Sequence, residues 1–204
     1  MCIRDRTSIY LAIDKGLTIE EVDKLTGPIS GRAKSATFRT ADVVGLDTLK
    51  SVSLTTYNKA TQDEERKMFN IPEILDQLID SDRLGQKTKS GFYKKNEDRS
   101  LSSINLRSGE YRPISKVYFD CFRVAKDQQS LSRKLKALCY GDDKGSKYFW
   151  EVTAKTLIYS ANRIPEISDE IYKIDDALKA GFGWELGPFE TWDAVGLELS
   201  LIHI

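Results

Sequence analysis

Histidine and cysteine are scarce in this chain of 204 residues. The single histidine, His203, is next to the last residue and forms no nucleophile–base pair with a nearby serine or cysteine. A hydrolase triad within this chain is therefore excluded. Cys2, Cys121 and Cys139 are odd in number, scattered, and without the spacing of metal ligands. They predict reduced thiols in a cytoplasmic protein that has no metal site.

The chain also lacks a net charge and a long apolar run. Lysine and arginine number 31, as do aspartate and glutamate, so no electrostatic footprint for nucleic acid or an anionic membrane is present. No run reaches the ~18 apolar residues that a membrane-spanning helix requires. An apolar content of 40% is ordinary for a globular protein. The length suits one large domain or two small ones.

One eight-residue phrase occurs twice. Arg39–Leu46 reads Arg-Thr-Ala-Asp-Val-Val-Gly-Leu, and Glu190–Leu197 reads Glu-Thr-Trp-Asp-Ala-Val-Gly-Leu, 151 residues later. Each copy follows a helix-like stretch in which an apolar residue precedes an aspartate, Val22-Asp23 and Ile174-Asp175. Because a self-match at a fixed offset indicates internal duplication, we interpret the chain as two copies of one helical unit.

Apolar residues recur at helical spacing through most of the chain, which predicts an all-α fold. The predicted helices cover 7–15, 19–26, 36–44, 46–57, 72–84, 114–124, 131–140, 147–162, 169–180 and a segment that begins at Pro188. The turn signal of Arg107–Tyr111, between short extended runs, predicts a small β-hairpin within 96–113. This hairpin is the natural boundary between the two copies.

Capping residues predict where these helices begin and end. Thr18 and Glu21 have the spacing of a capping box. The other predicted starts are serine caps or prolines in the first turn: Ser35, Ser168, Pro72 and Pro188. The predicted stops are glycines: Gly16, Gly45, Gly85 and Gly181.

Two features suggest catalysis or cofactor binding, and each has a structural alternative. Gly181–Gly187 resembles a dinucleotide loop, but its third glycine comes one residue late and it follows a predicted helix instead of a strand. We interpret it as a tight turn between helices. Asp42 and Asp193 could be catalytic carboxylates, but they lie in different copies, whereas an acid–base pair must converge on one substrate atom. Capping of backbone N–H groups is the favoured interpretation.

Two further sets of side chains are candidates for binding. Three basic residues flank a glycine- and serine-containing loop at a helix start, where an anionic group could bind, and we take them as candidate substrate-binding residues: Arg32, Lys34 and Arg39. A solvated loop is the competing interpretation. Four aromatic residues could line an acyl pocket, although core packing is favoured for them: Phe182, Trp184, Phe189 and Trp192.

Several motifs occur together in an order that one family shares. Gly27-Pro28, then Phe38–Asp47, then Leu84–Thr88 and Gly91–Tyr93 resemble the C-terminal domain of 3-hydroxyacyl-CoA dehydrogenase, and Gly183–Gly196 resembles it again. The residues that carry this pattern are Thr40, Asp42, Gly45, Gly91, Phe92, Tyr93, Gly187, Pro188, Thr191, Asp193 and Gly196. The tandem resembles the long bacterial form, in which the dehydrogenase is fused to an enoyl-CoA hydratase for fatty-acid β-oxidation. Lys89 departs from the pattern, since the family usually has glycine there.

The resemblance implies a domain organisation and a reaction. It implies helical domains over 7–95 and 114–204, the second truncated, joined by a linker over 96–113 that holds the hairpin. The reaction is NAD-dependent oxidation of a 3-hydroxyacyl-CoA to a 3-ketoacyl-CoA, with a histidine as general base. The family's NAD-binding domain, which carries the catalytic groups, would precede residue 1, and the hydratase would follow residue 204. No catalytic residue of the family matches here, so this fragment alone is expected to be inactive.

The ends and the partners are also matters of expectation. Residues 1–6 and 199–204 look like translated sequencing adapter, which predicts an internal piece of a longer protein. The resemblance implies an acyl-CoA substrate. Because single-copy relatives dimerise through this domain, it also implies a homo-oligomer or a pairing of the two copies. The alternative from another class is a non-catalytic helical module that joins subunits or domains.

Overall fold

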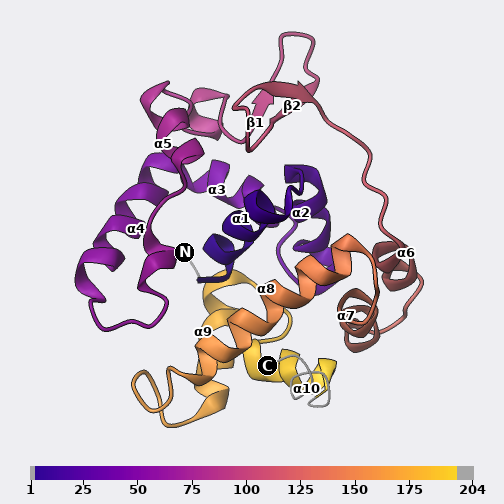
Figure 1. Cartoon of the computed structure of the whole chain (residues 1–204). Helices are drawn as coiled ribbons and strands as arrows, with labels where there is room; N and C mark the ends of the chain where they lie inside the picture. The colour runs from indigo at the N-terminus through magenta and orange to yellow at the C-terminus, as the bar shows by residue number, and fades with distance from the viewer. Residues whose placement is uncertain (1–2, 197–204) are drawn as a thin grey trace. The chain divides into compact units, whose positions relative to one another are not determined.

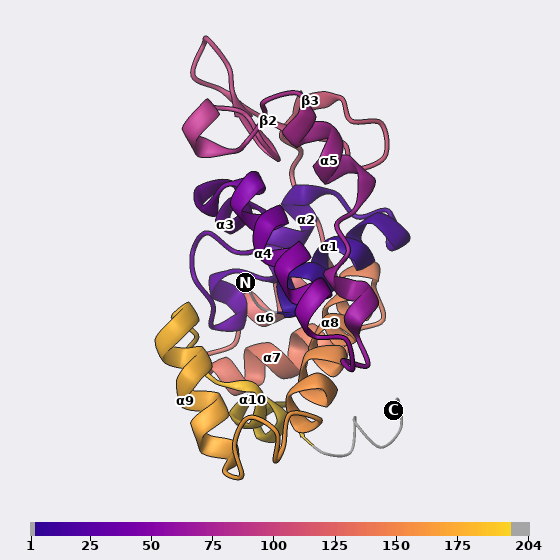
Figure 2. The same cartoon turned by 90° about the vertical axis from the view of Figure 1, so that its left-hand side faces the viewer.

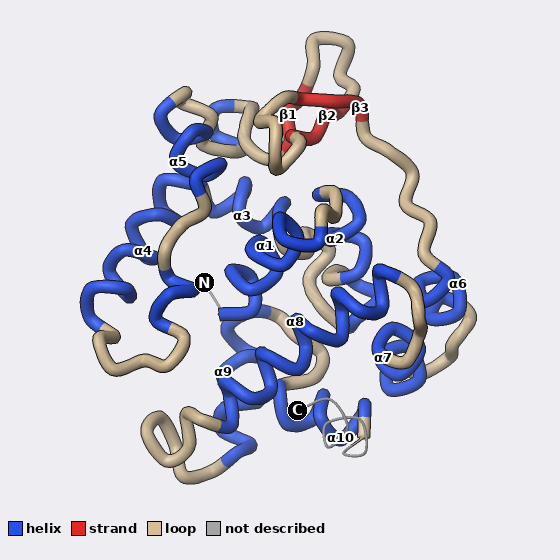
Figure 3. Tube along the Cα trace, in the orientation of Figure 1, coloured by secondary structure: helices blue, strands red, loops and turns tan. Residues whose placement is uncertain are grey.

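The computed structural model describes residues 3–196, and its architecture is mostly helical (Figure 1). His203, Leu197, Cys2 and the end of the chain after Gly196 lie outside the described residues. The α-helices are α1 Ile3–Lys15, α2 Ile19–Leu25, α3 Phe38–Val44, α4 Leu46–Lys59, α5 Glu73–Asp80, α6 Asp120–Lys126, α7 Leu131–Cys139, α8 Lys144–Ala161, α9 Ile171–Phe182 and α10 Pro188–Val195. The strands are β1 Tyr93–Lys95, β2 Leu101–Ile104 and β3 Tyr111–Pro113 (Figure 3).

The chain forms two compact units, each assembled from two segments. Unit 1 comprises Met1–Asp23 with Thr37–Val117, and unit 2 comprises Lys24–Ala36 with Tyr118–Ile204. The sheet belongs to unit 1, and the loop after α2 belongs to unit 2. The domain boundaries predicted at 95/96 and 113/114 stay a prediction.

The sequence signals at the end of α1 and in α2 are confirmed. Gly16 has φ +62°, as expected for the residue that follows a helix end. The capping box at α2 is confirmed, because Thr18 N donates to Glu21 Oε2 (2.7 Å) and Glu21 N donates to Thr18 Oγ1 (3.3 Å). The stripe on α2, with Ile19, Val22 and Leu25, is fully buried. Burial of such side chains stabilises the fold by about 1.5–3 kcal/mol each.

The repeated phrase lies on α3, and Gly45 separates α3 from α4. Gly45 has φ +98° and ψ +130°, a conformation that side-chain-bearing residues avoid, and its N–H donates to Ala41 O at the helix end. The predicted break at this residue is confirmed. Phe38 of α3 packs edge-on against Phe92, with ring centroids 4.7 Å apart, and both rings are fully buried.

The strands form an antiparallel sheet of order β1-β2-β3. β2 pairs with β3 through Ser103 opposite Arg112, and β1 pairs with β2 through Tyr93 opposite Ser103. The predicted β-hairpin is confirmed as β2–β3. The additional strand, β1, precedes the predicted hairpin and was not predicted.

The described part of unit 2 contains helices and no strand. Helix α7 contacts α6, α8 and α10, and α9 lies beside α10 (Figure 2). Ser130 caps α7 by accepting from Arg133 N, a cap that was not predicted. Pro188 occupies the first turn of α10, as predicted. The core of this unit includes Tyr148, Phe149 and Val152, all on α8 and fully buried.

Several predicted helix ends are wrong. In unit 1, Pro72 is the N-cap of α5 and not its first residue, and the helix ends at Asp80 instead of continuing to Gly85. In unit 2, α6 begins at Asp120 although the pattern predicted 114, and residues 114–119 are not helical.

Helix α9 is displaced by two residues at each end relative to the prediction. Its N-cap is Glu170, while Ser168 Oγ accepts from Glu170 N in the turn before it. Gly183, with φ +63°, closes it in place of Gly181. A capping residue before the helix and a glycine after it were correctly expected, but the sequence offers more than one residue for each position, and the structure uses Glu170 and Gly183. No helix within residues 3–196 combines the length and the apolar character needed to cross a membrane.

Candidate functional site

Asp42, the aspartate of the repeated phrase, holds a neighbouring segment of unit 1. Its Oδ1 accepts from Phe92 N and its Oδ2 from Tyr93 N, each at 2.8 Å. The backbone of Gly91 lies so close to Asp42 and Gly85 that a Cβ on Gly91 would overlap Asp42 Oδ1 and lie 2.6 Å from Gly85 Cα. Asp42 therefore binds backbone N–H groups, as the favoured interpretation predicted.

Asp23 of α2 binds the start of α3 in the same manner. Its Oδ1 accepts from Thr37 N (3.0 Å) and Phe38 N (2.7 Å), and its Oδ2 accepts from Arg39 N (3.2 Å). The N-cap residue of α3 is Thr37, whose side chain makes no capping hydrogen bond. The prediction that Ser35 caps this helix is wrong, because a carboxylate from the preceding helix takes the free N–H groups.

The carboxyl groups of Asp23 and Asp42 both have a raised pKa. Burial raises the pKa of Asp23 to about 6, against the lowering effect of its hydrogen bonds from Phe38 N and Tyr93 Oη. Burial likewise raises the pKa of Asp42 to about 6, although Tyr93 N, Phe92 N and the charge of Arg39 favour the anion. Desolvation thus outweighs hydrogen bonding at both positions.

Asp42 with Phe92 N and Tyr93 N forms what we call the Asp42 clamp, and Asp23 with the N–H groups of Thr37, Phe38 and Arg39 forms the Asp23 clamp. Tyr93 connects these two clamps. Its backbone N–H donates to Asp42 and its hydroxyl donates to Asp23 Oδ2 (2.9 Å), while the guanidinium of Arg39 lies 4.9 Å from its ring centroid. Burial, and then the charge of Asp23, raise the pKa of Tyr93 above its ordinary value of 10.0. Arg39, the first residue of the phrase, is exposed, and this cation–π contact holds its guanidinium over the Tyr93 ring.

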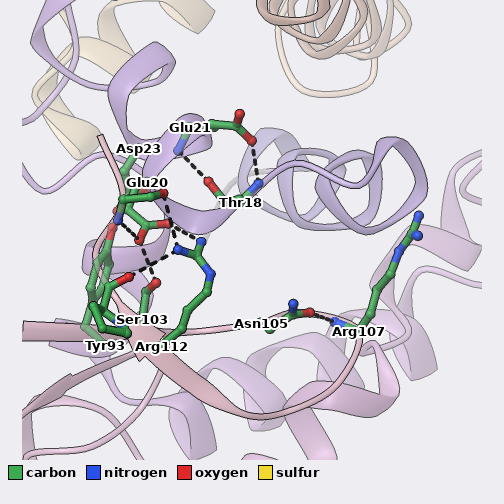
Figure 4. A network of polar contacts seen from close by, with 11 residues as sticks. Thr18, Glu20, Glu21, Asp23, Tyr93, Ser103, Asn105, Arg107 and Arg112 are labelled. Atoms are coloured by element: carbon green, nitrogen blue, oxygen red, sulfur yellow. Dashed lines mark hydrogen bonds and ion pairs between the residues drawn. The ribbon is translucent and has the colours of Figure 1, made fainter. Parts of the chain in front are cut away.

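A second polar network joins α2 to the sheet (Figure 4). Glu20 is 7% exposed, accepts from Ser103 Oγ at 2.7 Å, and forms an ion pair with Arg112 Nη2 at 2.8 Å. Burial raises the pKa of Glu20, but the hydrogen bonds from Ser103 and backbone N–H groups, with the charge of Arg112, hold it below its ordinary value. The network fixes the sheet on α2.

In unit 2 an aspartate also binds the start of a helix. Asp175 of α9 accepts from Phe189 N (2.8 Å) through Oδ1 and from Glu190 N (3.1 Å) through Oδ2. Gly196 ends α10 with φ +102° and ψ +142°, and its N–H donates to Trp192 O. In unit 1, Asp23 accepts from Phe38 N and Arg39 N in the same manner, and Gly45 N donates to Ala41 O.

The two phrase aspartates differ. Asp42 is buried, whereas Asp193 is exposed, and within residues 3–196 it makes no hydrogen bond to a backbone N–H group. The capping interpretation is therefore confirmed for Asp42 alone. Of the remaining motif residues, Thr191 and Pro188 are buried in unit 2, and Thr40 is half-buried on α3.

The three predicted substrate-binding residues do not form one described site. Arg39 belongs to unit 1, whereas Arg32 and Lys34 belong to unit 2. Arg32 is 9% exposed, and its guanidinium lies 4.7 Å from the ring centroid of Trp184. Lys34 is exposed. Their role in substrate binding stays a prediction.

The glycine-rich loop does not fit NAD. Gly181 and Phe182 are the last residues of α9, and Gly183–Gly187 connects α9 to α10. The loop therefore follows a helix and not a strand, and a Cβ on Gly187 would overlap the Asp175 side chain. The negative charge of the Asp175 carboxylate at this position would repel a pyrophosphate. The prediction of a tight helix–helix turn is confirmed. In the aromatic cluster, Trp184 is buried and Phe182 is 37% exposed, with ring centroids 6.5 Å apart.

The Glu20 network was missed by reasoning from the sequence. Glu20 sits in the charged first turn of a capped helix, which is an ordinary solvated position, and Arg112 lies 92 residues away. No local pattern signals their pairing. Asp23 was visible only as part of the repeat, where its recurrence before each phrase was the available signal. Within residues 3–196, no group of three metal-ligating side chains is present.

Comparisons with known proteins match the first part of the chain to a family model. Residues 6–95 match the family model described as "3-hydroxyacyl-CoA dehydrogenase, C-terminal domain". The match contains Asp42, Gly91 and Tyr93, and it ends before the second phrase.

Particular relatives agree with this match. A protein of Bacillus subtilis named "Probable 3-hydroxyacyl-CoA dehydrogenase" is 44% identical over 185 residues, which are 91% of this chain and 23% of the relative. A protein of Deinococcus radiodurans with the same name is 49% identical over 83 residues, 41% of this chain and 23% of the relative. A "Putative fatty acid oxidation complex trifunctional enzyme" of Rickettsia felis is 27% identical over 205 residues, 95% of this chain and 27% of the relative.

The chain is therefore related to 3-hydroxyacyl-CoA dehydrogenases of fatty-acid oxidation. It spans about a quarter of the length of these curated relatives. No solved structure matches it.

Proposed function

We propose that this chain is the substrate-side and interaction portion of an NAD-dependent 3-hydroxyacyl-CoA dehydrogenase of fatty-acid β-oxidation. In the whole protein, a 3-hydroxyacyl-CoA is oxidised to a 3-ketoacyl-CoA. The observation that carries the proposal is the match of residues 6–95 to the family's C-terminal domain. NAD is assigned to a separate domain, because the only glycine-rich loop within residues 3–196 that resembles a dinucleotide motif does not fit it.

We further infer that unit 2 is a second copy of the same domain. Its support is local geometry, since Asp23 and Asp175 bind the first N–H groups of α3 and α10 in the same way. Gly45 and Gly196 also end these helices with closely similar backbone angles. Such matching contacts are expected when a chain contains two copies of one domain.

Arg39 is the residue of this proposal that is simplest to test. The Tyr93 ring holds its guanidinium, which is exposed and so available to a CoA phosphate. We expect acetoacetyl-CoA to bind the chain, and Arg39→Gln to weaken that binding about ten-fold, the size of effect that one charge-assisted contact supplies. Arg99→Gln, an exposed arginine of the β1–β2 turn, is the matched control and is expected to bind as the parent does.

Two measurements test the whole proposal. Equilibrium binding of acetoacetyl-CoA should be detectable, whereas NADH oxidation with that substrate should be absent, because the chain supplies no catalytic histidine of the family. Turnover by the chain alone would refute the assignment of catalysis to another domain. Absence of acyl-CoA binding, together with self-association in light scattering, would favour the alternative function, a non-catalytic helical assembly module.

A further inference from the structure

A cavity of about 240 Å³ lies within unit 1, between the end of α1 and the turn that joins β2 to β3. It is separate from the Asp42 and Asp23 clamps. One part of its wall is apolar and buried, made by Ala12, Leu17 and Ile104. The other part is polar and includes Thr18, Asn105, Arg107 and Arg112 (Figure 4). Pockets that combine an apolar wall with a few convergent polar groups are typical small-molecule sites.

The charged residues of the lining are both cations. Arg112 is already neutralised, because it pairs with Glu20 and its Nη1 donates to Pro113 O and Ser115 Oγ. Arg107 is different. Its Nη2 lies 3.5 Å from Ile13 O, and within residues 3–196 it forms no ion pair. The guanidinium at this end of the cavity therefore carries an uncompensated charge.

The neutral polar groups of the lining are placed as donors. Asn105 Oδ1 accepts from Arg107 N and Ser108 N, which fixes the amide and leaves its NH₂ group without a hydrogen bond to any residue of 3–196. Thr18 Oγ1 accepts from Glu21 N, so its hydroxyl hydrogen is available for donation. Donors and one free cation, without any acidic residue in the lining, select an anionic acceptor.

We propose that this cavity binds a small carboxylate that carries a short alkyl chain. The carboxylate would accept from Asn105 Nδ2 and Arg107, and the alkyl chain would lie on Ala12, Leu17 and Ile104. A free phosphate fits less well, because a strongly hydrated dianion gains nothing from the apolar wall. The site is independent of the proposed function, since it uses none of the residues assigned there.

The experiment is a titration of the full chain followed by ¹H–¹⁵N NMR, with butyrate as the probe. Saturable shifts of the Asn105 side-chain amide, Arg107 Nε–H and Leu106 N–H are expected at about millimolar concentration, as suits so small a ligand. Butanamide, which keeps the alkyl chain and loses the charge, should bind at least ten-fold more weakly, as should inorganic phosphate.

Two variants separate binding from folding. Asn105→Asp keeps the acceptor for Arg107 N and Ser108 N but replaces the donor with a negative charge, so it should fold and bind butyrate at least ten-fold more weakly. Asn58→Asp, which adds the same charge at an exposed position of α4, is its control. Arg107→Gln should also lose at least ten-fold, with Arg99→Gln as control. Because the Arg107 side chain covers Gly16, the midpoint of thermal unfolding of the Arg107→Gln variant is measured in parallel.

Each outcome decides the proposal. Equal binding of butanamide and butyrate would show that the charge plays no part, and equal binding of phosphate would show that the apolar wall plays none; either result overturns it. Shifts that do not saturate, or an Asn105→Asp variant that binds as the Asn58→Asp control does, would overturn it as well.

Discussion

Replacing Gly91 by alanine tests the clamp that Asp42 forms. A Cβ at this position would overlap Asp42 Oδ1 and would lie 2.6 Å from Gly85 Cα and 2.9 Å from Gly85 N. Two of these neighbours are backbone atoms, which cannot move aside as the end of a flexible side chain does. Gly85 is itself confined, because a Cβ there would lie 2.8 Å from Asp42 Cα.

The magnitude follows from the hydrogen bonds that the methyl group would displace. Asp42 accepts from Phe92 N and Tyr93 N, and a hydrogen bond to a charged group contributes about 1.5–3 kcal/mol. Loss of both, with partial relaxation, is expected to lower the free energy of unfolding by about 3–5 kcal/mol. This is a large fraction of the ~5–15 kcal/mol that stabilises a typical domain.

Urea denaturation followed by circular dichroism, with hydrogen exchange at the Tyr93 amide, measures the effect. The control is Gly181→Ala in α9, where a Cβ would meet nothing within 4 Å. That variant should be neutral or more stable by up to ~1 kcal/mol, because alanine favours a helix over glycine. A Gly91→Ala protein within ~1 kcal/mol of the parent, or with unchanged exchange at Tyr93, would refute the close approach of these segments.

Two further predictions concern the same unit. Asp42 should titrate in a ¹³C NMR experiment with a midpoint near 6, above its ordinary value of 3.8, because it is buried. Since the pKa of Asp42 is higher in the folded than in the unfolded state, protonation of Asp42 favours folding. Its contribution to the free energy of unfolding is therefore present below about pH 4 and is lost as the pH rises through about 6. A titration midpoint below 4 would contradict this prediction. Thr18→Val should lower the free energy of unfolding by about 1 kcal/mol by removing the N-cap acceptor for Glu21 N, and an unchanged urea midpoint would show that the capping box contributes nothing.

The sequence by itself determined the features that depend on neighbouring residues. The capping box at Thr18, the buried stripe of α2, the break at Gly45 and the β2–β3 hairpin all follow from helical periodicity, short-range capping or turn chemistry. These are interactions within a few residues, so their signals survive in the order of residues alone. The sequence also pointed correctly to Asp42 as an acceptor for backbone N–H groups, whereas the same prediction for Asp193 is not confirmed.

Only the tertiary structure decided which distant groups meet. Asp23 replaces the predicted serine cap because the fold returns α3 to the side of α2, and Glu20 finds its partner 92 residues away in Arg112. Arg32 and Arg39, seven positions apart and predicted as one set, belong to different units. The physical reason is common to these cases. A buried charge or a free N–H group is satisfied by whichever partner the packed chain brings close, and packing over long separations leaves no local pattern.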